Sequence, residues 1–200
     1  MRMQLGIREF ILYSRKGRTD SFSLSLREAG RLDIVHECIQ AGLFLSHGIR
    51  RNVVFHALLG GPPRPPLCLT IDGSTLRDVR TDQEAWRSIL RRVLAGESHS
   101  GLSLERRSFE SLLKVKADQS SIYVLEEDGE EVDKIQIGKN PVFVLGDHIG
   151  LPKKAEAFAL RYGVKISLGK QAYLAASCIA ILNYLLDRRR GHSVTRQEMK

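Results

Sequence analysis

Apolar residues follow two kinds of pattern that alternate along the chain. Short apolar runs are typical of buried strands, whereas apolar residues that recur every three or four positions are typical of helices. The first pattern predicts strands over residues 8–14, 51–61, 67–73, 121–128, 141–147 and 164–169. The second predicts helices over residues 25–45, 81–96, 108–114, 153–163 and 172–190.

Several local signals predict where these elements end. Thr81 and Glu84 have the spacing of a capping box, so a helix is expected to begin there, and Gly163 is expected to close another helix. The sequence GPPRPP at 61–66 predicts a stiff extended loop, because proline can continue neither a helix nor a central strand. A turn is predicted at Asp128–Gly129, within the segment 97–135, which has the least regular pattern.

The alternation of strands and helices predicts an α/β fold with a mostly parallel sheet and helices on both of its faces. The length of 200 residues and the absence of a proline-rich or glycine-rich linker predict one domain over residues 1–200. No internal repeat of solenoid period is visible. The polar residues 191–200 are expected to fray.

Composition changes this picture in one respect only. Hydrophobic residues make up 42% and charged residues 27% of the chain, as in an ordinary water-soluble protein. The formal charge of +8 is unusual enough to raise the prospect of a polyanionic partner. A basic surface that serves only solubility is an equally good explanation of that charge.

The three cysteines, Cys38, Cys68 and Cys178, lack the spacing of a metal site, so no bound metal is expected. They are typical of reduced thiols in a cytoplasmic protein. The N-terminus has no apolar signal segment, and the most apolar stretch, Tyr173 to Leu186, is too short and polar to cross a bilayer. It predicts a buried helix, and no membrane association is expected.

Glycines follow three of the predicted strands, at Gly60–Gly61, Gly146 and Gly169. Ligands of parallel sheets bind at the carboxyl ends of strands, and glycine allows a ligand to approach the backbone closely. Asp147 and His148 lie between Gly146 and Gly150, an unusual composition for a simple turn. The glycines therefore indicate a ligand pocket, although turns after strands also use glycine commonly.

Common catalytic motifs are absent from the chain. Around residues 163–170 the spacing is one residue too long for a phosphate-binding P-loop, and the pattern runs through a strand. The chain also lacks GxGxxG, GxSxG and HExxH. These absences argue against a nucleoside triphosphatase, a dehydrogenase, an α/β-hydrolase and a zinc protease.

Two polar clusters are candidates for chemistry. Arg31, Asp33 and His36 occur close together in GRLDIVH, where Asp33 could instead complement a helix dipole. His47, Arg50 and Arg51 in FLSHGIRR suit either RNA phosphates or the end of a helix. Aromatic residues are scarce at 6%, so any RNA contact is expected to depend on phosphates and pockets.

Several of these segments together carry a resemblance to a known family. FLSHGIRRNVVF, PVFVLGDHIG, ISLG and SCIAILNYLLDRR resemble the archaeal tRNA pseudouridine N1-methyltransferases, which belong to the SPOUT class of RNA methyltransferases. The similarity spans about residues 8–190. GRLDIVH is similar to a GRPDIVH-like segment of the ribosomal pseudouridine N1-methyltransferases, which share the class and the reaction.

The resemblance implies a SPOUT-type fold with a C-terminal trefoil knot over about residues 140–190. From topology alone an open sheet would be expected, because knots are rare. It also implies a homodimer in which the knot helices pack together, a tRNA substrate modified at pseudouridine 54 of the T-arm, and S-adenosylmethionine bound in bent form. The residues implied to bind this cofactor are Leu145, Gly146, Asp147, His148, Gly150, Ser167, Leu168, Gly169, Leu174 and Cys178.

The same resemblance implies roles for the two polar clusters. Asp33 would accept the N1 proton or orient the base, and Arg31 would stabilise charge on the ring or hold a phosphate. His47, Arg50 and Arg51 would bind the RNA backbone. The alternatives are another SPOUT activity, namely ribosomal pseudouridine N1-methylation or ribose 2′-O-methylation, and a non-catalytic RNA-binding assembly factor.

Overall fold

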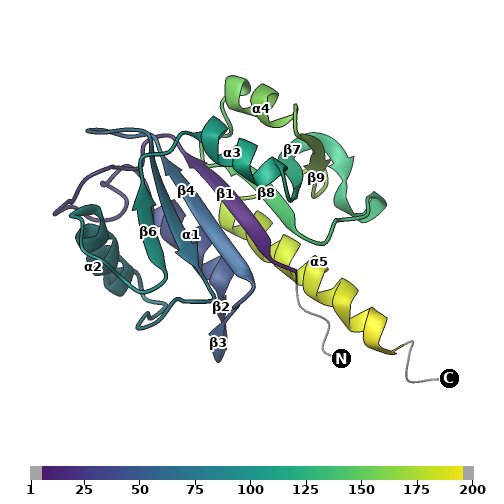
Figure 1. Cartoon of the computed structure of the whole chain (residues 1–200), viewed down its shortest axis with the longest axis horizontal. Coiled ribbons are helices and arrows are strands. Elements are labelled where there is room, and N and C mark those ends of the chain that lie inside the picture. The colour runs from purple at the N-terminus through teal and green to yellow at the C-terminus, as the bar shows by residue number, and fades with distance from the viewer. Residues whose placement is uncertain (1–5, 196–200) are drawn as a thin grey trace.

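The computed structural model describes the backbone of residues 6–195 and the side chains of residues 6–188. Its centre is a seven-stranded sheet with the order β6-β5-β4-β1-β8-β7-β9 (Figure 1). A small separate hairpin pairs β2 with β3. The strands are β1 (Arg8–Ser14), β2 (Phe44–Leu45), β3 (Gly48–Ile49), β4 (Val53–Leu59), β5 (Leu67–Asp72), β6 (Leu102–Glu105), β7 (Ser121–Glu131), β8 (Pro141–Gly146) and β9 (Gly163–Ser167).

The sheet is mostly parallel, as the alternation of elements predicts. β1 lies between β4 and β8 and is parallel to both, and β7 is parallel to β8 and β9. Only β5 and β6, at one edge, run antiparallel to their neighbours. The carboxyl ends of five strands therefore meet at one edge of the sheet, where α/β folds place their ligands.

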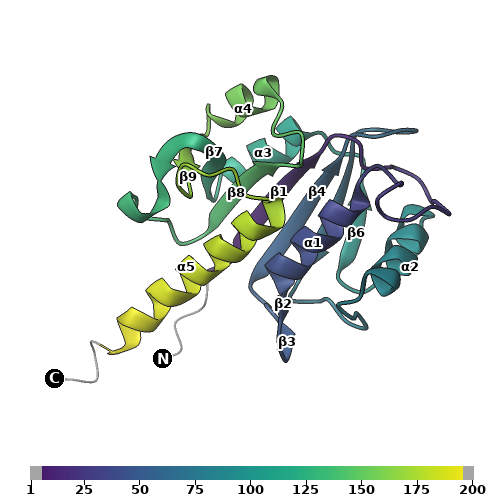
Figure 2. The same cartoon turned by 180° about the vertical axis from the view of Figure 1, so that it is seen from behind.

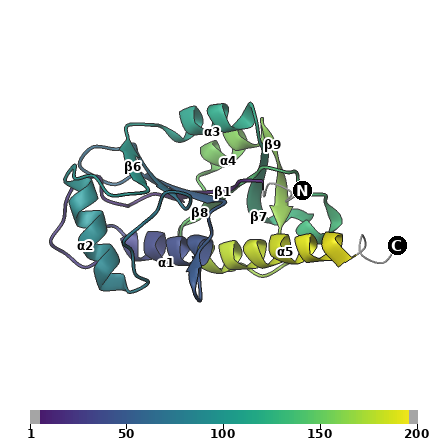
Figure 3. The same ribbon diagram turned by 60° about the horizontal axis from the view of Figure 1, so that its bottom comes forward.

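Helices cover both faces of the sheet, which confirms the predicted architecture. They are α1 (Leu32–Leu43), α2 (Gln83–Leu94), α3 (Phe109–Ala117), α4 (Lys153–Ala159) and α5 (Ala175–Thr195), with a short 3₁₀ turn, η1 (Val132–Lys134). Figure 3 shows α1 and α5 on one face and α3 and α4 on the other. Successive side chains of β1 serve the two faces in turn. Phe10 and Leu12 pack in the core that contains α1, α2 and α5, whereas Ile11 packs beneath α3 and α4.

The first helix is shorter than predicted, because it begins at Leu32 and not at residue 25. Gly30 and Arg31 have φ angles of 73° and 65°, in the left-handed region. A right-handed helix cannot pass through two such residues. Residues 25–31 instead form turns, in which the side chains of Ser25 and Glu28 hydrogen-bond to each other. Apolar spacing alone does not reveal this break.

Two further helix boundaries differ from prediction. The helix α2 is capped by Asp82, whose carboxylate accepts a hydrogen bond of 2.9 Å from the backbone N–H of Ala85, so Thr81 is not the cap. The helix α4 ends at Ala159, and Gly163 is the first residue of β9. A Cβ at position 163 would overlap the backbone of the adjacent Ile122, which explains why the strand begins on glycine there.

The predicted turn at Asp128–Gly129 is wrong. The strand β7 continues through it to Glu131, and Leu125 and Glu130 both pair with Ile166, so the intervening residues bulge out. The short strand β6 was not predicted. The helix α5 extends to Thr195, so the polar segment expected to fray is helical up to that residue, while residues 196–200 lie outside the described part of the chain.

The helix α5 packs against α1 through one face only. Ile179 and Leu182 are buried there, and the side-chain amide of Asn183 donates to the carbonyl oxygens of Ala41 and Gly42 at 3.0 and 3.1 Å. The opposite face stays open, with Tyr184 60% exposed. The prediction of a buried helix is therefore correct for the face toward α1 and wrong for the opposite face. No helix within the described residues has the length and apolarity needed to cross a membrane.

A buried ionic group joins β1, β4 and α3. A carboxylate oxygen of Glu9 lies 2.7 Å from His56 Nε2 and 2.6 Å from Lys116 Nζ, and Thr70 Oγ1 lies 2.8 Å from the other ring nitrogen of His56. Burial raises the pKa of Glu9, but the hydrogen bonds and charges of His56 and Lys116 outweigh it and lower the pKa overall. The ionised carboxylate is therefore the form that stabilises the fold.

We expect this ionic group to make the stability of the fold depend on pH. A carboxylate whose pKa is lowered on folding stabilises the protein above its unfolded pKa of about 4.3, and that stabilisation is lost as the pH falls through the folded pKa. The free energy of unfolding, measured with urea, should therefore fall more steeply below about pH 4.5 for the wild type than for Glu9→Gln. Parallel pH curves for the two proteins would contradict this prediction.

Candidate functional site

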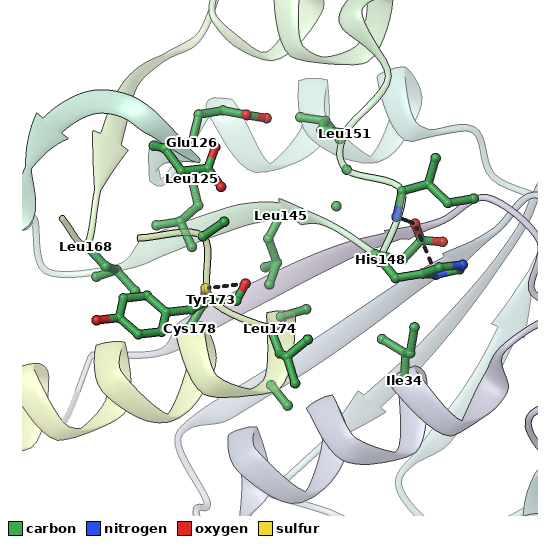
Figure 4. Close-up of a pocket in the computed structure, with 18 of the residues that line it drawn as sticks. Ile34, Leu125, Glu126, Leu145, His148, Leu151, Leu168, Tyr173, Leu174 and Cys178 are labelled. Carbon is green, nitrogen blue, oxygen red and sulfur yellow. Dashed lines mark hydrogen bonds and ion pairs between the residues drawn. The ribbon is translucent and has the colours of Figure 1, made fainter. Parts of the chain in front are cut away.

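A cavity of about 560 Å³ opens at the carboxyl ends of β7, β8 and β9, beside the first turns of α1 and α5. Figure 2 shows α1 and α5 in front of the sheet, running in the same direction. The walls come from four segments far apart in sequence, and Figure 4 shows apolar side chains facing the space from several of them. These segments are the β7 bulge at 125–127, the loop 145–151, the loop 168–176 with Cys178, and α1 with Arg31, Ile34 and Glu37.

The loop after β8 owes its shape to two glycines. A Cβ at Gly146 would overlap the backbone of Gly150 and Leu151, so only glycine lets the loop fold back over the strand end. Gly150 has a φ angle of 82°, which favours glycine at the return of the turn. The result is a tight backbone bend that forms one wall of the cavity.

Asp147 holds this bend in place. One of its carboxylate oxygens accepts a hydrogen bond of 2.9 Å from the backbone N–H of Arg15, and the other accepts one of 2.9 Å from the N–H of Ile149. The side chain is 1% exposed, and His148 Nδ1 lies 3.8 Å from it. Asp147 therefore orients two loops, while His148, whose side chain is one-third exposed, remains accessible in the cavity wall.

The second glycine loop follows β9. Ser167 Oγ donates to the carbonyl oxygen of Gly169 at 2.8 Å, and the N–H of Gly169 donates back to Ser167 Oγ at 2.9 Å. Gly169 has a φ angle of 116°, which this local turn requires. Ser167 is buried and shapes the turn, so that Leu168 and Gly169 line the cavity.

Cys178 lies in the cavity wall near the start of α5. Its thiol is 3.7 Å from the carbonyl oxygen of Tyr173, toward which it can donate. Burial raises the pKa of this thiol to about 11, so it is protonated at neutral pH. A protonated, buried thiol is a weak nucleophile, and Cys178 therefore contributes shape to the cavity and no covalent chemistry.

The opposite wall is acidic. Glu126 and Glu127 line the cavity from the β7 bulge, which is tied to β9 because Lys165 Nζ lies 3.0 Å from Asp128. The same ammonium lies 2.7 Å from Glu156. Burial and the charge of Glu156 raise the pKa of Glu126. A positively charged ligand group beside Glu126 would favour its ionised form.

Arg31 and Asp33 form a pair at the mouth of the cavity. The guanidinium of Arg31 donates three hydrogen bonds of 3.0 to 3.2 Å to the carboxylate of Asp33, and these bonds raise the pKa of Arg31. Arg31 lines the cavity, whereas Asp33 is not among the lining residues. His36 points elsewhere, with Nε2 3.2 Å from the carbonyl oxygen of Thr81, so it does not join the pair.

The cavity gathers most of the residues that the sequence associates with cofactor binding. The exceptions are Ser167 and the glycine pair that follows β4, Gly60–Gly61. Gly60–Gly61 packs beneath the backbone of residues 15–17 and lies outside the cavity. The predicted residues that line the cavity are Leu145, Gly146, Asp147, His148, Gly150, Leu168, Gly169, Leu174 and Cys178.

The cluster predicted to bind RNA lies away from this cavity. His47 is in the hairpin that follows α1, at the opposite end of that helix from Arg31, and a helix of this length spans about 18 Å. Arg50 forms an ion pair of 2.6 Å with Asp187. Arg51 donates to the carbonyl oxygens of Gly73 and Leu76, which indicates a structural role.

Sequence reasoning missed about half of the cavity wall. The β7 bulge escaped because residues 125–127 were predicted to belong to a regular strand that ends in a turn at Asp128–Gly129. The segment 171–176 could have been found, since it joins the ISLG motif directly to the last helix. The missed residues are Ile34, Glu37, Leu125, Glu126, Glu127, Ile149, Leu151, Gln171, Ala172, Tyr173, Ala175 and Ala176.

Comparison with known proteins supplies the family. A family model for S-adenosylmethionine-dependent RNA methyltransferases matches residues 7–191, which is nearly the whole chain. The chain belongs to this RNA methyltransferase family.

Two relatives match nearly the whole of this chain. The tRNA (pseudouridine(54)-N(1))-methyltransferase of Methanocaldococcus jannaschii is 35% identical, over 92% of this chain and 98% of the relative. The protein of the same name from Methanocella arvoryzae is 34% identical, over 92% of this chain and 100% of the relative.

Among solved structures, Archaeoglobus fulgidus Nep1 bound to S-adenosylhomocysteine superposes with a TM-score of 0.66 at 12% identity. The match covers 94% of this chain and 100% of Nep1. At that identity the likeness concerns the fold alone, and it agrees with the SPOUT-type architecture expected from the sequence.

Proposed function

We propose that this methyltransferase transfers a methyl group from S-adenosylmethionine to N1 of pseudouridine 54 in tRNA. The observation that carries the proposal is the end-to-end match to relatives named for this reaction. The cavity supports it independently, because two glycine loops and the start of α5 converge on one space.

The cavity suits S-adenosylmethionine in size and chemistry. A volume of about 560 Å³ is in the range of small-molecule sites. Apolar side chains such as Leu125, Leu145 and Leu168 can pack on the adenine ring, and the backbone of the two glycine loops can hydrogen-bond to its edge. Glu126 and Glu127 supply negative charge for the ammonium and sulfonium groups.

The reaction makes limited chemical demands on the protein. When bound, S-adenosylmethionine supplies a methyl group that is already activated by its sulfonium. One N–C bond forms as one C–S bond breaks, and the N1 proton of pseudouridine must leave. The chain therefore has to position the base, exclude water and manage one proton and one developing negative charge. Positioning can contribute roughly 7–11 kcal/mol, which is more than a single base catalyst usually supplies.

Arg31 and Asp33 are the side chains best placed to manage that charge. We assign Arg31 to the negative charge that develops on the ring, because its guanidinium lines the cavity. Asp33 holds that guanidinium through three hydrogen bonds, which makes it a positioning residue. Acceptance of the N1 proton by Asp33 itself is the competing role, and pH dependence separates the two.

The enzyme is expected to act as a cytoplasmic homodimer with a trefoil knot over about residues 140–190. Support for the dimer comes from α5, whose exposed Ala180 and Tyr184 lie four residues apart on the face turned away from α1. Light scattering on Tyr184→Glu should therefore give the mass of one chain where the wild type gives two. Equal masses for both proteins would count against this interface.

The proposed reaction is tested on two T-arm hairpin transcripts that differ only at position 54. One carries pseudouridine and the other uridine, whose N1 is occupied by the sugar. Nucleoside mass spectrometry after incubation with enzyme and S-adenosylmethionine should show 1-methylpseudouridine from the first transcript and no methylation of the second. Methyl transfer to both would indicate ribose 2′-O-methylation, and methyl transfer to neither would overturn the proposal.

A further inference from the structure

A group of basic residues lies near the cavity on two loops, the loop 15–31 that joins β1 to α1 and the loop that follows β4. Arg15, Lys16 and Arg27 belong to the first loop and Arg64 to the second. We call these four residues the basic platform. It is continuous with the cavity, because Arg31 at the end of the first loop lines the cavity and Asp147 in the cavity wall accepts a hydrogen bond from the backbone of Arg15.

The two loops are held together through their backbones. A Cβ at either Gly30, near the end of the first loop, or Gly61, in the second, would overlap the carbonyl oxygen of Lys16, so both segments approach this peptide as closely as glycine permits. Thr19 completes the connection. Its N–H donates to the carbonyl oxygen of Pro62 at 3.0 Å, and its hydroxyl oxygen accepts from the N–H of Arg64 at 2.8 Å. The cations are thus presented on a fixed surface.

The charges of this surface are poorly balanced within the chain. Among the described side chains, no carboxylate lies within 4.0 Å of a nitrogen of Lys16, Arg27 or Arg64. The Nε of Arg15 is buried and makes no hydrogen bond in the described structure. The same holds for the Nε of Arg50, whose guanidinium already pairs with Asp187, so the charges of Lys16, Arg27 and Arg64 are what indicate an anionic partner.

The basic surface continues away from the cavity. Farther along the first loop, Ser21, Phe22 and Ser23 line an open groove together with Arg91 and Arg92 of α2. Arg92 lies 3.9 Å from Glu97, the acidic residue of the groove. Cations are therefore present both on the platform and in a groove bordered by a later part of the same loop. An extended anion matches this arrangement better than a small one.

We propose that the basic platform binds the phosphate backbone of the substrate RNA and directs the target base into the cavity. This inference rests on the proposed function for the identity of the RNA. It replaces His47, Arg50 and Arg51 as the main phosphate contacts within one subunit, because those residues lie at the other end of α1 and two of them have partners inside the chain. Phosphate contacts position a nucleic acid, while the pocket selects the base.

The test removes three platform charges without touching the cavity. The platform variant carries Lys16→Gln, Arg27→Gln and Arg64→Gln. The control variant carries Lys114→Gln, Lys139→Gln and Lys154→Gln, which removes the same charge from exposed positions on α3, before β8 and on α4. Binding of a pseudouridine-containing T-arm hairpin is followed by fluorescence anisotropy from 50 to about 300 mM salt, the range in which phosphate contacts weaken steeply.

The platform variant should bind the hairpin at least about tenfold more weakly than the wild type, and its log Kd should depend less on log salt, by roughly 0.7 to 0.9 per lost contact. Its affinity for S-adenosylmethionine should be unchanged in calorimetry. Lys16→Arg, Arg27→Lys and Arg64→Lys together should restore binding, which separates lost charge from misfolding. Matching curves for the platform and control variants would overturn the inference.

The outcomes also separate this inference from the proposed function. If the wild type binds the hairpin through the platform but produces no 1-methylpseudouridine, the proposed reaction fails and the platform stands. If the wild type methylates the hairpin and the platform variant binds it as the control does, the reaction stands and the platform fails.

Discussion

Replacement of Gly146 by alanine should strongly weaken binding of S-adenosylmethionine. The added Cβ would overlap backbone atoms of Gly150 and Leu151, which cannot rotate away as a flexible side chain could. The loop must open to relieve the overlap, and the wall of the cavity moves with it. We expect calorimetry to show affinity at least about 100-fold lower, a loss of ~2.7 kcal/mol.

Gly48→Ala provides the matched control for this experiment. A Cβ at Gly48, in the β2–β3 hairpin, would meet no atom within 4 Å, so the same substitution there should leave both affinity and thermal stability unchanged. Circular dichroism on both variants shows whether Gly146→Ala remains folded. A folded Gly146→Ala protein that binds the cofactor like the wild type would refute the assignment of this loop.

Loss of Arg31 should slow methyl transfer by about 10²-fold or more in single-turnover assays, with affinity for S-adenosylmethionine largely retained. Removal of one group that stabilises charge in a transition state typically costs about 10²–10³ in rate. Arg31→Ala removes the cation from the cavity, and Asp33→Ala leaves the cation present without the three hydrogen bonds that hold it.

The double variant decides how Asp33 acts. If Asp33 works through Arg31, the effects of Asp33→Ala and Arg31→Ala should be far from additive, because the second substitution removes an interaction already lost. The pH profile should then keep its shape in Asp33→Ala. If Asp33 accepts the N1 proton, the two losses should add, and the acidic limb of the profile should change. Wild-type rates in Arg31→Ala would contradict both the role of Arg31 in stabilising the ring charge and the role of Asp33 in holding Arg31.

Much of the fold followed from residue patterns because its elements are long and regular. The run PVFVLG and the repeated spacing in α5 leave little doubt between strand and helix. The β7 bulge could not be predicted, because the Asp128–Gly129 pair that favours a turn in isolation is overridden by pairing with β9. The late start of α1 was hidden for a similar reason. Arg31 has a left-handed backbone conformation, which cannot be predicted from the type of its side chain.

The candidate site could be predicted only where glycine and a motif coincide. Gly146 and Gly169 pointed to the cavity, whereas Gly60–Gly61 looked the same in sequence and serves loop packing. Local sequence cannot separate these uses of glycine, because the difference lies in which distant backbone approaches. The acidic wall was missed for the same reason, since Glu126 reaches the cavity only through the pairing of β7 with β9.

The carboxylate of Asp147 joins the bend after β8 to the backbone of Arg15. Any occupant that restrains one of these loops thereby restrains the other, and thermodynamic linkage requires such an influence to be mutual. Methyl donor and RNA should consequently raise each other's affinity by the same factor. Catalysis would then be confined to encounters in which both substrates are present.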